Sequence, residues 1–420
     1  MLPQKMKQES KYILFSKCVN AFCIILFVFA GCYKKQYYSK ISVNNGTPVD
    51  TIKTVVSPIN NDTAKYGHTK NINIDIPEIT AKDYYSLAYE ELKRMLEGKQ
   101  SLSFKKAVFI TENAWFENNI NYNAYNEYIS GLTDICRQWN KANKLTDYKF
   151  EDSTQVALSG SIFKVMTDTV WDVSGRIISL PFQYDFEDNF AQKRWENMFL
   201  IKLMATHKGN CHSLPFLYKI LAKELGVKAY LSFAPNHIYI KQKSKKTSWY
   251  NTELTNAMFP VDAWIMSSGY VSRESIVSGI YMDTIGEKQS IAVCLNDLAK
   301  GYLRKFKSSP DLQFVIRCCD LGLNYFPNYV ELLLLKAETT KKQYENHITK
   351  YGKEVANKEP YKFKTDALYE EMEKTYATLA TLHYKEIPLQ MYNEWMASME
   401  RDKSIYNNKE INVIFKTQSK

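Results

Sequence analysis

The pattern of apolar and polar positions is clearest between residues 207 and 255. Apolar side chains recur there at three- and four-residue steps, which predicts a helix with one buried face and with Lys219 on the polar side. The apolar positions are Leu214, Leu217, Tyr218, Leu221 and Leu225. Pro215 restricts the regular helix to begin near Ser213, because a proline deeper inside would remove a hydrogen bond. Gly226 is a typical helix stop.

The residues after this helix show a pattern typical of three short strands. Val227 to Phe233 and His237 to Ile240 are rich in strand-forming residues. A polar hairpin then returns the chain along Trp249 to Leu254. On such a hairpin, His237 and Glu253 can lie side by side on adjacent strands.

Three residues of this segment are of the types that thiol catalysis requires. Cys211 lies at or just before the first turn of the predicted helix, where free N–H groups and the helix dipole favour a thiolate. The same N–H groups are candidate oxyanion donors. His237 and Glu253 are suited to act as the base and its orienting carboxylate. Gln183, in a predicted loop before this segment, is a further candidate oxyanion donor.

In this order the three residues resemble the core motif of the transglutaminase-like superfamily, in which a cysteine at a helix start is followed by His and Asp on neighbouring antiparallel strands. The acidic residue of that family commonly stands in the phrase Trp-x-x-x-Asp-x-Thr. Here Trp249 to Thr255 matches this phrase with Glu253 in place of Asp. The resemblance covers roughly Trp195 to Asp262.

This resemblance implies an α+β fold class with a papain- or transglutaminase-like core, a helix packed on an antiparallel sheet, flanked by helical segments. It implies amide hydrolysis or acyl transfer through a Cys211 thioester, without a cofactor. Ile238 and Leu254 replace residues that are usual in the family. The alternative is therefore a non-catalytic binding module that keeps the fold and uses its C-terminal helices for protein–protein interaction.

A zinc site competes for part of the same segment. His207, Cys211 and His212 lie within six residues. However, ligands on one helix face would need a regular helix through Gly209, and no Cys-x-x-Cys or His-x-x-x-His pair stands elsewhere. We therefore expect no metal.

The N-terminus predicts the compartment. Four lysines precede an apolar run from Val19 to Phe29, and small residues lead into Cys32. This pattern is typical of a secretory signal, and the run is short for a membrane span. Its end resembles a bacterial lipobox, which implies lipidation of Cys32. The expected location is the bacterial cell envelope, lipid-anchored to a membrane on its periplasmic or surface face.

Charge and the other cysteines exclude some classes of function. The net charge of +10 is spread without Arg-rich blocks, so we expect no nucleic-acid partner. The expected substrate is a peptide, protein or peptidoglycan-like amide. After processing and lipidation of Cys32, the five remaining cysteines form no regular disulfide framework. Cys136, Cys294 and the pair Cys318–Cys319 are expected to serve packing.

Composition shifts divide the chain into five parts. Residues 1–32 form the signal peptide and lipobox, and 33–80 a flexible tether. Residues 81–160 are an N-terminal helical region, 161–285 the transglutaminase-like core, and 286–420 a C-terminal helical region. Helix–Pro–helix punctuation makes the last region resemble tetratricopeptide helix pairs. It is expected to pack on the core, where it could bind a protein partner.

Overall fold

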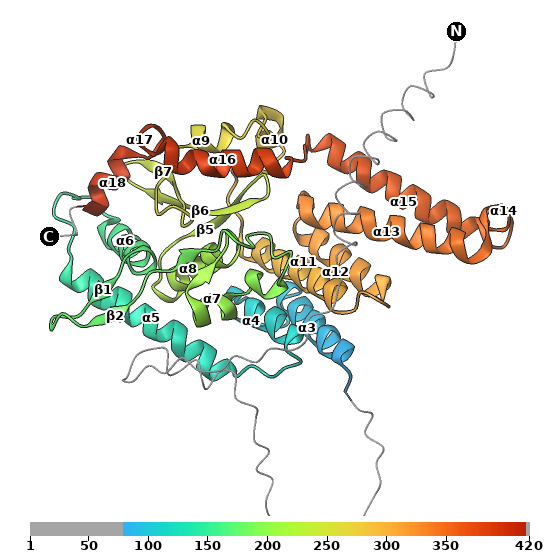
Figure 1. Cartoon of the computed structure of the whole chain (residues 1–420), viewed down its shortest axis with the longest axis horizontal. Coiled ribbons are helices and arrows are strands. Elements are labelled where there is room, and N and C mark those ends of the chain that lie inside the picture. Colours follow the sequence, from blue (N-terminus) through green and yellow to red (C-terminus); the bar gives the residue numbers. More distant parts are fainter. Residues whose placement is uncertain (1–78, 417–420) are drawn as a thin grey trace, which may run out of the picture. The chain divides into compact units, whose positions relative to one another are not determined.

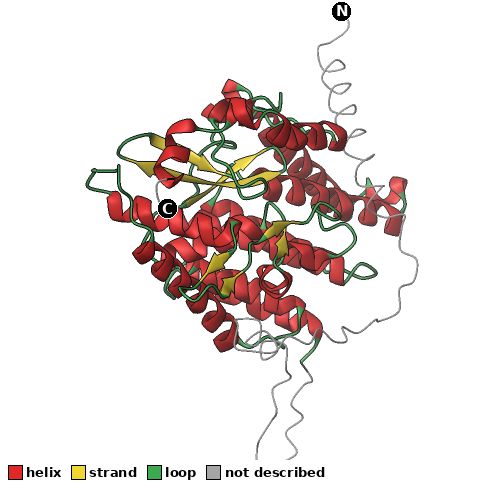
Figure 2. Ribbon diagram, turned by 60° about the vertical axis from the view of Figure 1, so that its left-hand side comes forward, coloured by secondary structure: helices red, strands yellow, loops and turns green. Residues whose placement is uncertain are grey.

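The computed structural model describes residues 79–416, and most of these residues are helical (Figures 1 and 2). The helices before the β region are α3 (Ala81–Leu96), α4 (Phe104–Trp115), α5 (Tyr122–Ala142) and α6 (Ser153–Thr167). The central helices are the 3₁₀ helix η1 (Trp195–Met198), α7 (Leu200–Thr206), α8 (Ser213–Glu224), α9 (Asp262–Met266) and α10 (Arg273–Val277). The C-terminal helices are α11 (Glu287–Lys305), α12 (Leu312–Tyr325), α13 (Val330–Tyr351), α14 (Lys353–Ala356), α15 (Lys362–Thr381), α16 (Leu389–Arg401), α17 (Lys403–Tyr406) and α18 (Lys409–Lys416).

The strands of the described residues form three small sheets. The largest is antiparallel, in the order β5 (Tyr230–Ala234), β6 (His237–Ser244) and β7 (Ser248–Thr252). A parallel pair joins β3 (Gln183–Tyr184) to β4 (Lys208–Gly209), and an antiparallel pair joins β1 (Val170–Trp171) to β2 (Ile177–Ser179). The three strands predicted after α8 are therefore present, in the predicted order.

The predicted fold class, an α+β papain- or transglutaminase-like core, is wrong. Most of residues 79–416 are helical, and no sheet within them has more than three strands. Residues 255–285 were predicted to belong to the sheet-containing core. They form α9, α10 and loops, and no strand. Helices take over the burial on both faces of the sheet: Leu231 and Ile240 pack in the cluster that contains α8, while Tyr239 packs with residues of α9 and α16.

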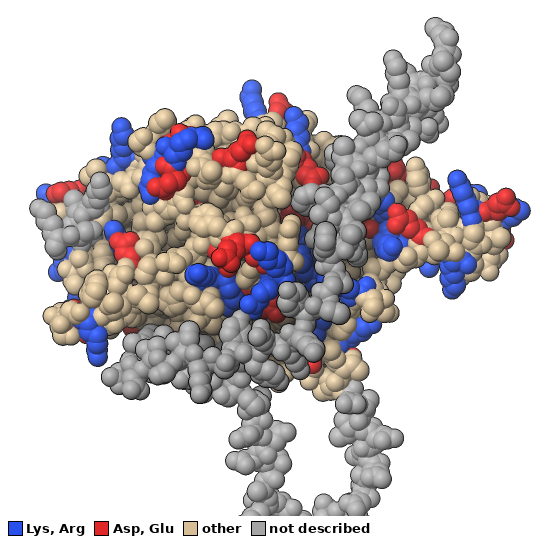
Figure 3. All heavy atoms as spheres, viewed as in Figure 1, with Lys and Arg blue, Asp and Glu red and all other residues tan. Residues whose placement is uncertain are grey.

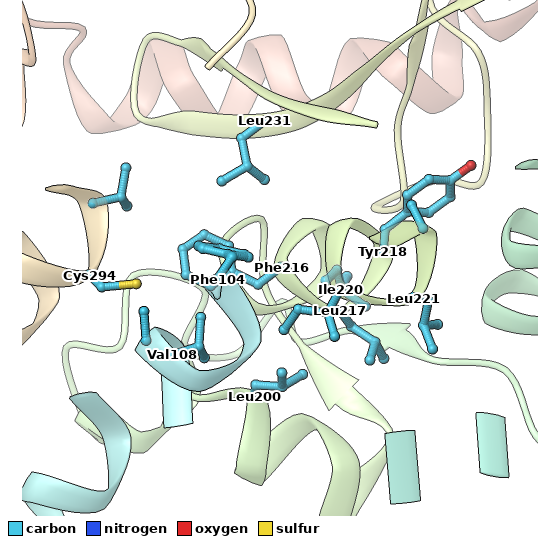
Figure 4. Packing of buried hydrophobic residues seen from close by; sticks show 14 of the residues in the cluster. Phe104, Val108, Leu200, Phe216, Leu217, Tyr218, Ile220, Leu221, Leu231 and Cys294 are labelled. Atoms are coloured by element: carbon cyan, nitrogen blue, oxygen red, sulfur yellow. The ribbon is translucent and has the colours of Figure 1, made fainter. Parts of the chain in front are cut away.

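Helix α8 runs through the middle of the main hydrophobic cluster. It packs against α5, α6, α7 and strands β5 and β6. Figure 4 shows its Phe216 and Leu217 among Phe104 of α4, Leu200 of α7 and Leu231 of β5. The helix ends as predicted: Gly226 has a φ of +72°, and the N–H of Val227 donates to the carbonyl of Ala222 at 2.8 Å. This is a Schellman termination, for which glycine is the favoured residue.

The prediction that Lys219 lies on a polar side of α8 is wrong, because every residue from Ser213 to Ala222 is buried and only the last two residues, Lys223 and Glu224, are exposed. Lys219 is only 4% exposed. Its ammonium lies 3.3 Å from a carboxylate oxygen of Glu287 and over the ring of Phe104. Burial lowers the pKa of Lys219, although Glu287 opposes this shift. The elements that surround α8 come from distant parts of the chain, so the periodicity of its own sequence could not predict them.

The C-terminal helices pack in sequence order and return to the sheet. Helix α11 contacts α3, α4 and α12, α12 contacts α13, and α13 contacts α15. Helix α16 then lies beside β6 and α9 (Figure 1).

None of the helices within residues 79–416 has the length and apolar character of a membrane span. On the face shown in Figure 3, basic and acidic side chains are interspersed.

The predicted domain boundaries stay predictions. The signal peptide, residues 1–32, and nearly all of the tether, 33–80, lie outside the described residues. The proposed regions 81–160, 161–285 and 286–420 share one hydrophobic cluster, since residues of α5, α8 and α12 all belong to it.

Candidate active site

The turn that holds Cys211 is shaped by its neighbours. Gly209 lies so close to the helix that a Cβ there would stand 2.5 Å from Ser213 Oγ. Oδ1 of Asn210 accepts hydrogen bonds from the N–H of His212 at 3.0 Å and of Ser213 at 3.1 Å. This arrangement caps the start of α8. It also occupies two of the helix-start N–H groups that were predicted as oxyanion donors.

His237 and Glu253 form a buried pair at the end of the three-stranded sheet. His237 opens β6 and Glu253 directly follows β7. Nε2 of His237 lies 2.6 Å from Oε2 of Glu253, and both side chains are buried. The N–H of Thr255 donates to the other carboxylate oxygen at 2.8 Å. Because Nε2 faces the carboxylate, it carries a proton, and Nδ1 is left for the Cys211 side.

Cys211 is the one described cysteine that is not fully buried. Its Sγ lies 3.9 Å from the carbonyl oxygen of Asn236. Burial by itself would raise the pKa of the Cys211 thiol, but the hydrogen bond and the charge of His237 hold that pKa below its usual value. Burial likewise opposes the charged form of His237, while the Glu253 carboxylate and Cys211 raise its pKa overall. The surroundings therefore favour a thiolate–imidazolium pair.

A residue that the sequence did not single out completes this group. Tyr392, on α16, places its hydroxyl 4.0 Å from Cys211 Sγ and 3.5 Å from His237 Nδ1. Trp395, one turn further along the helix, lies edge-on to the His237 ring at 5.9 Å. The spacing of Tyr392, Trp395, Met396 and Met399 indicates a buried helix face. Nothing in that spacing tells which part of the chain the face covers.

A second missed pair lies next to Cys211 in the chain. His212 Nε2 lies 2.9 Å from Asp297 Oδ2, on α11, and its Nδ1 lies 3.0 Å from the carbonyl oxygen of Met198. Burial would lower the pKa of His212, but Asp297 raises it overall. A positively charged His212 beside Cys211 would also favour the thiolate. The two partners are 85 positions apart in the chain, so sequence spacing offered no signal.

Gln183 is not among these neighbours. It stands on β3 with an exposed side chain, and within residues 79–416 no hydrogen bond links that side chain to Cys211. Tyr184 points to the opposite side of the strand and is buried. Burial, followed by the nearby Cys211, raises the pKa of Tyr184. Cys32, the predicted lipidation site, lies outside the described residues.

A cleft of about 660 Å³ adjoins the site. One wall comes from the segment after β3, including Phe186 and Phe190. Leu389 and Met396 of α16 also line the cleft. Tyr184 lines the cleft as well, and Phe190 connects the cleft with the site because its ring packs against that of Tyr392.

The residues of the competing zinc site have protein partners. The two ring nitrogens of His207 lie 3.1 Å from the hydroxyl of Tyr128 and 3.1 Å from the carbonyl oxygen of Leu180. His212 is held by Asp297, as described above. Across the described part of the chain, no group of three or more His, Cys, Asp or Glu side chains could hold a metal ion.

Comparisons with known proteins assign no family. No protein-family description matches the chain, and no curated protein matches it. A solved structure that aligns is the crystal structure of menin that reveals its binding site for the Mixed Lineage Leukemia (MLL) protein. The alignment covers 82% of this chain and 100% of that one, at 10% identity and a TM-score of 0.29. At that score the similarity establishes neither a fold nor a function.

Proposed function

We propose that this protein is a thiol-dependent acyl-transfer enzyme that hydrolyses an amide or transfers its acyl group. The observation that carries the proposal is the buried His237–Glu253 pair, 2.6 Å apart, beside Cys211, whose pKa the hydrogen bond and the charge of His237 lower. The motif resemblance to transglutaminase-like enzymes agrees with this chemistry. The proposal does not depend on the predicted sheet-rich fold.

In the proposed reaction, the Cys211 thiolate attacks the carbonyl carbon and the carbonyl π electrons move to oxygen. When the carbonyl re-forms, the carbon–nitrogen bond breaks. The His237 imidazolium gives its proton to the departing amine, and a thioester remains. Water or a second amine then attacks the thioester, His237 takes the proton from that nucleophile, and the thiolate leaves. Glu253 orients the imidazole and stabilises its charged form throughout.

The proposed substrate is a peptide, protein or peptidoglycan-like amide that enters through the cleft between α16 and the segment after β3. The cleft has apolar side chains such as Phe190 and Met396 and charged ones such as Asp188 and Lys193, which suits a substrate with both apolar and polar groups. The proposed location is the bacterial cell envelope, with Cys32 as lipid anchor. Metabolic labelling with a tagged fatty acid tests this location: incorporation should be lost in Cys32→Ser, and retention there would contradict it.

The first test is the alkylation rate of Cys211 by iodoacetamide as a function of pH, followed on its own peptide by mass spectrometry in the full chain. Because the pKa of Cys211 is lowered, the rate should rise with pH through a midpoint below that of an ordinary thiol. His237→Ala removes the group that lowers this pKa and leaves burial, which raises it. The midpoint should therefore move upward, with a loss of about tenfold or more at neutral pH.

His383→Ala is the matched control, because His383 is an exposed histidine. It should leave the profile unchanged. An ordinary thiol profile in the wild type, unchanged by His237→Ala, would end the enzyme proposal and favour the binding-module alternative.

A further inference from the structure

The hydroxyl of Tyr392 is placed where an acyl-transfer reaction needs a donor. It lies 4.0 Å from the Cys211 sulfur and 3.5 Å from Nδ1 of His237. A carbonyl oxygen under attack stays within about 3 Å of the sulfur, and an effective donor lies about 2.7–3.1 Å from that oxygen. The distance of 4.0 Å between the hydroxyl and the sulfur is compatible with both conditions.

The position of this hydroxyl is held by packing rather than by the site itself. Tyr392 is fully buried and lies edge-on to Phe190 at 4.9 Å. One turn along α16, Trp395 stacks on Trp264 at 4.6 Å and donates its indole N–H to the carbonyl of Trp264 at 3.0 Å. The indole N–H of Trp264 donates in turn to Ser398 Oγ at 3.2 Å. Donors fixed in this way need no reorganisation when charge develops.

Tyr392 also keeps the proton that a donor must have. Burial, and then the nearby Cys211 thiolate, raise the pKa of Tyr392 well above its usual value. The other candidates are less suited. The helix-start N–H groups of His212 and Ser213 already donate to Oδ1 of Asn210, and the Gln183 side chain is exposed.

We propose that Tyr392 is the oxyanion donor of this site, a catalytic residue supplied by the C-terminal helices. The inference rests on the proposed function. As the thiolate forms its bond to the carbonyl carbon, the C=O π pair moves onto oxygen, and that oxygen accepts a hydrogen bond from the Tyr392 hydroxyl. The bond is given up when the carbonyl re-forms and the leaving group departs with the carbon–nitrogen bonding pair. Tyr392 keeps its proton throughout.

Two reactions of Cys211 separate this role from a structural one. Alkylation by iodoacetamide is a displacement at a saturated carbon and forms no oxyanion. Acylation by p-nitrophenyl acetate forms one and releases nitrophenolate, which needs no proton from His237. In Tyr392→Phe, measured on the full chain, the alkylation rate on its high-pH plateau should stay within about twofold, while acylation falls on the order of 10²- to 10³-fold.

Tyr270→Phe is the matched control, because the Tyr270 hydroxyl contacts Met391 of α16 at 3.1 Å and is not part of the site. Both rates should remain at the wild-type level. Equal acylation in wild type and Tyr392→Phe would overturn the inference. Faster acylation in Tyr392→Phe would also overturn it, and would identify Tyr392 as a plug over the sulfur. The inference would also be overturned if wild-type Cys211 reacted readily with iodoacetamide but was not acylated by p-nitrophenyl acetate. Failure of the proposed function has a different signature: slow alkylation in every variant.

Discussion

Cysteine occurs in two environments in this molecule. One is the turn before α8, and the other is the buried faces of α5, α11 and α12. Cys136, Cys294, Cys318 and Cys319 are enclosed within helices, and burial raises the pKa of each of these four thiols. Cys211 is subject to the same effect of burial, but His237 reverses it. The charged partner is what turns a thiol with a raised pKa into a candidate nucleophile with a lowered one.

This difference is local to a few atoms. In α12, Cys318 and Cys319 pack in the main hydrophobic cluster. In the turn before α8, Cys211 is in contact with a histidine whose charge a buried carboxylate stabilises. Burial opposes the thiolate in both groups, but in the second the attraction of His237 outweighs it, because a buried charge pair is poorly screened by water. The comparison can be tested at the carboxylate, at the thiols and at the neighbouring histidine.

The largest effect is expected for Glu253→Gln. An amide in place of the carboxylate removes the charge that raises the pKa of His237, and its N–H₂ group can force the wrong tautomer. Turnover of p-nitrophenyl acetate should fall on the order of 10³- to 10⁴-fold. Glu287→Gln, which alters the Lys219 ion pair instead, should change it little. Equal losses in both variants would mean that the site carboxylate has no special role.

A smaller effect separates the thiols of the native protein. At pH 7, Cys211 should react with iodoacetamide at least about 100-fold faster than Cys136, Cys294, Cys318 or Cys319, since each pKa unit changes the thiolate fraction about tenfold. Quantifying each labelled peptide by mass spectrometry measures the ratio. In denaturant the five rates should converge. Comparable labelling of Cys211 and Cys318 in the native state would show that the two thiols do not differ in reactivity.

The smallest effect is expected for Asp297→Asn. Asp297 raises the pKa of His212, whose positive charge favours the Cys211 thiolate. Its loss should move the midpoint of Cys211 alkylation upward by up to about one pKa unit. Asp320→Asn, which affects the partly exposed pair with Lys336, should not move the midpoint. A downward shift in Asp297→Asn would show that His212 does not support the thiolate.

Local features were predictable because they depend on near neighbours in the chain. Pro215 and Gly226 set the bounds of α8, and the β5–β6–β7 hairpins followed from alternation and polar turns. His237 and Glu253 are only 16 positions apart, so one hairpin brings them together. Cys211 joins them because α8 packs against β5 and β6.

Features that depend on distant packing were not predictable. The buried ammonium of Lys219 and the dominance of helices over the sheet both result from segments that close around α8. The same holds for the His212–Asp297 pair. A single sequence without known long-range contacts gives the period of a buried helix face, not the identity of its partner.

By itself the sequence determined the candidate nucleophile, its base and carboxylate, and the helix and hairpin that carry them, because short-range periodicity and turn chemistry specify such elements. Only the tertiary structure decided that α16, which lies over a hundred residues further along the chain, returns to cover the site with Tyr392 and Trp395. The physical reason is that apolar burial is non-directional. An aromatic face on a helix requires cover, but which surface provides it is settled by the packing of the whole chain.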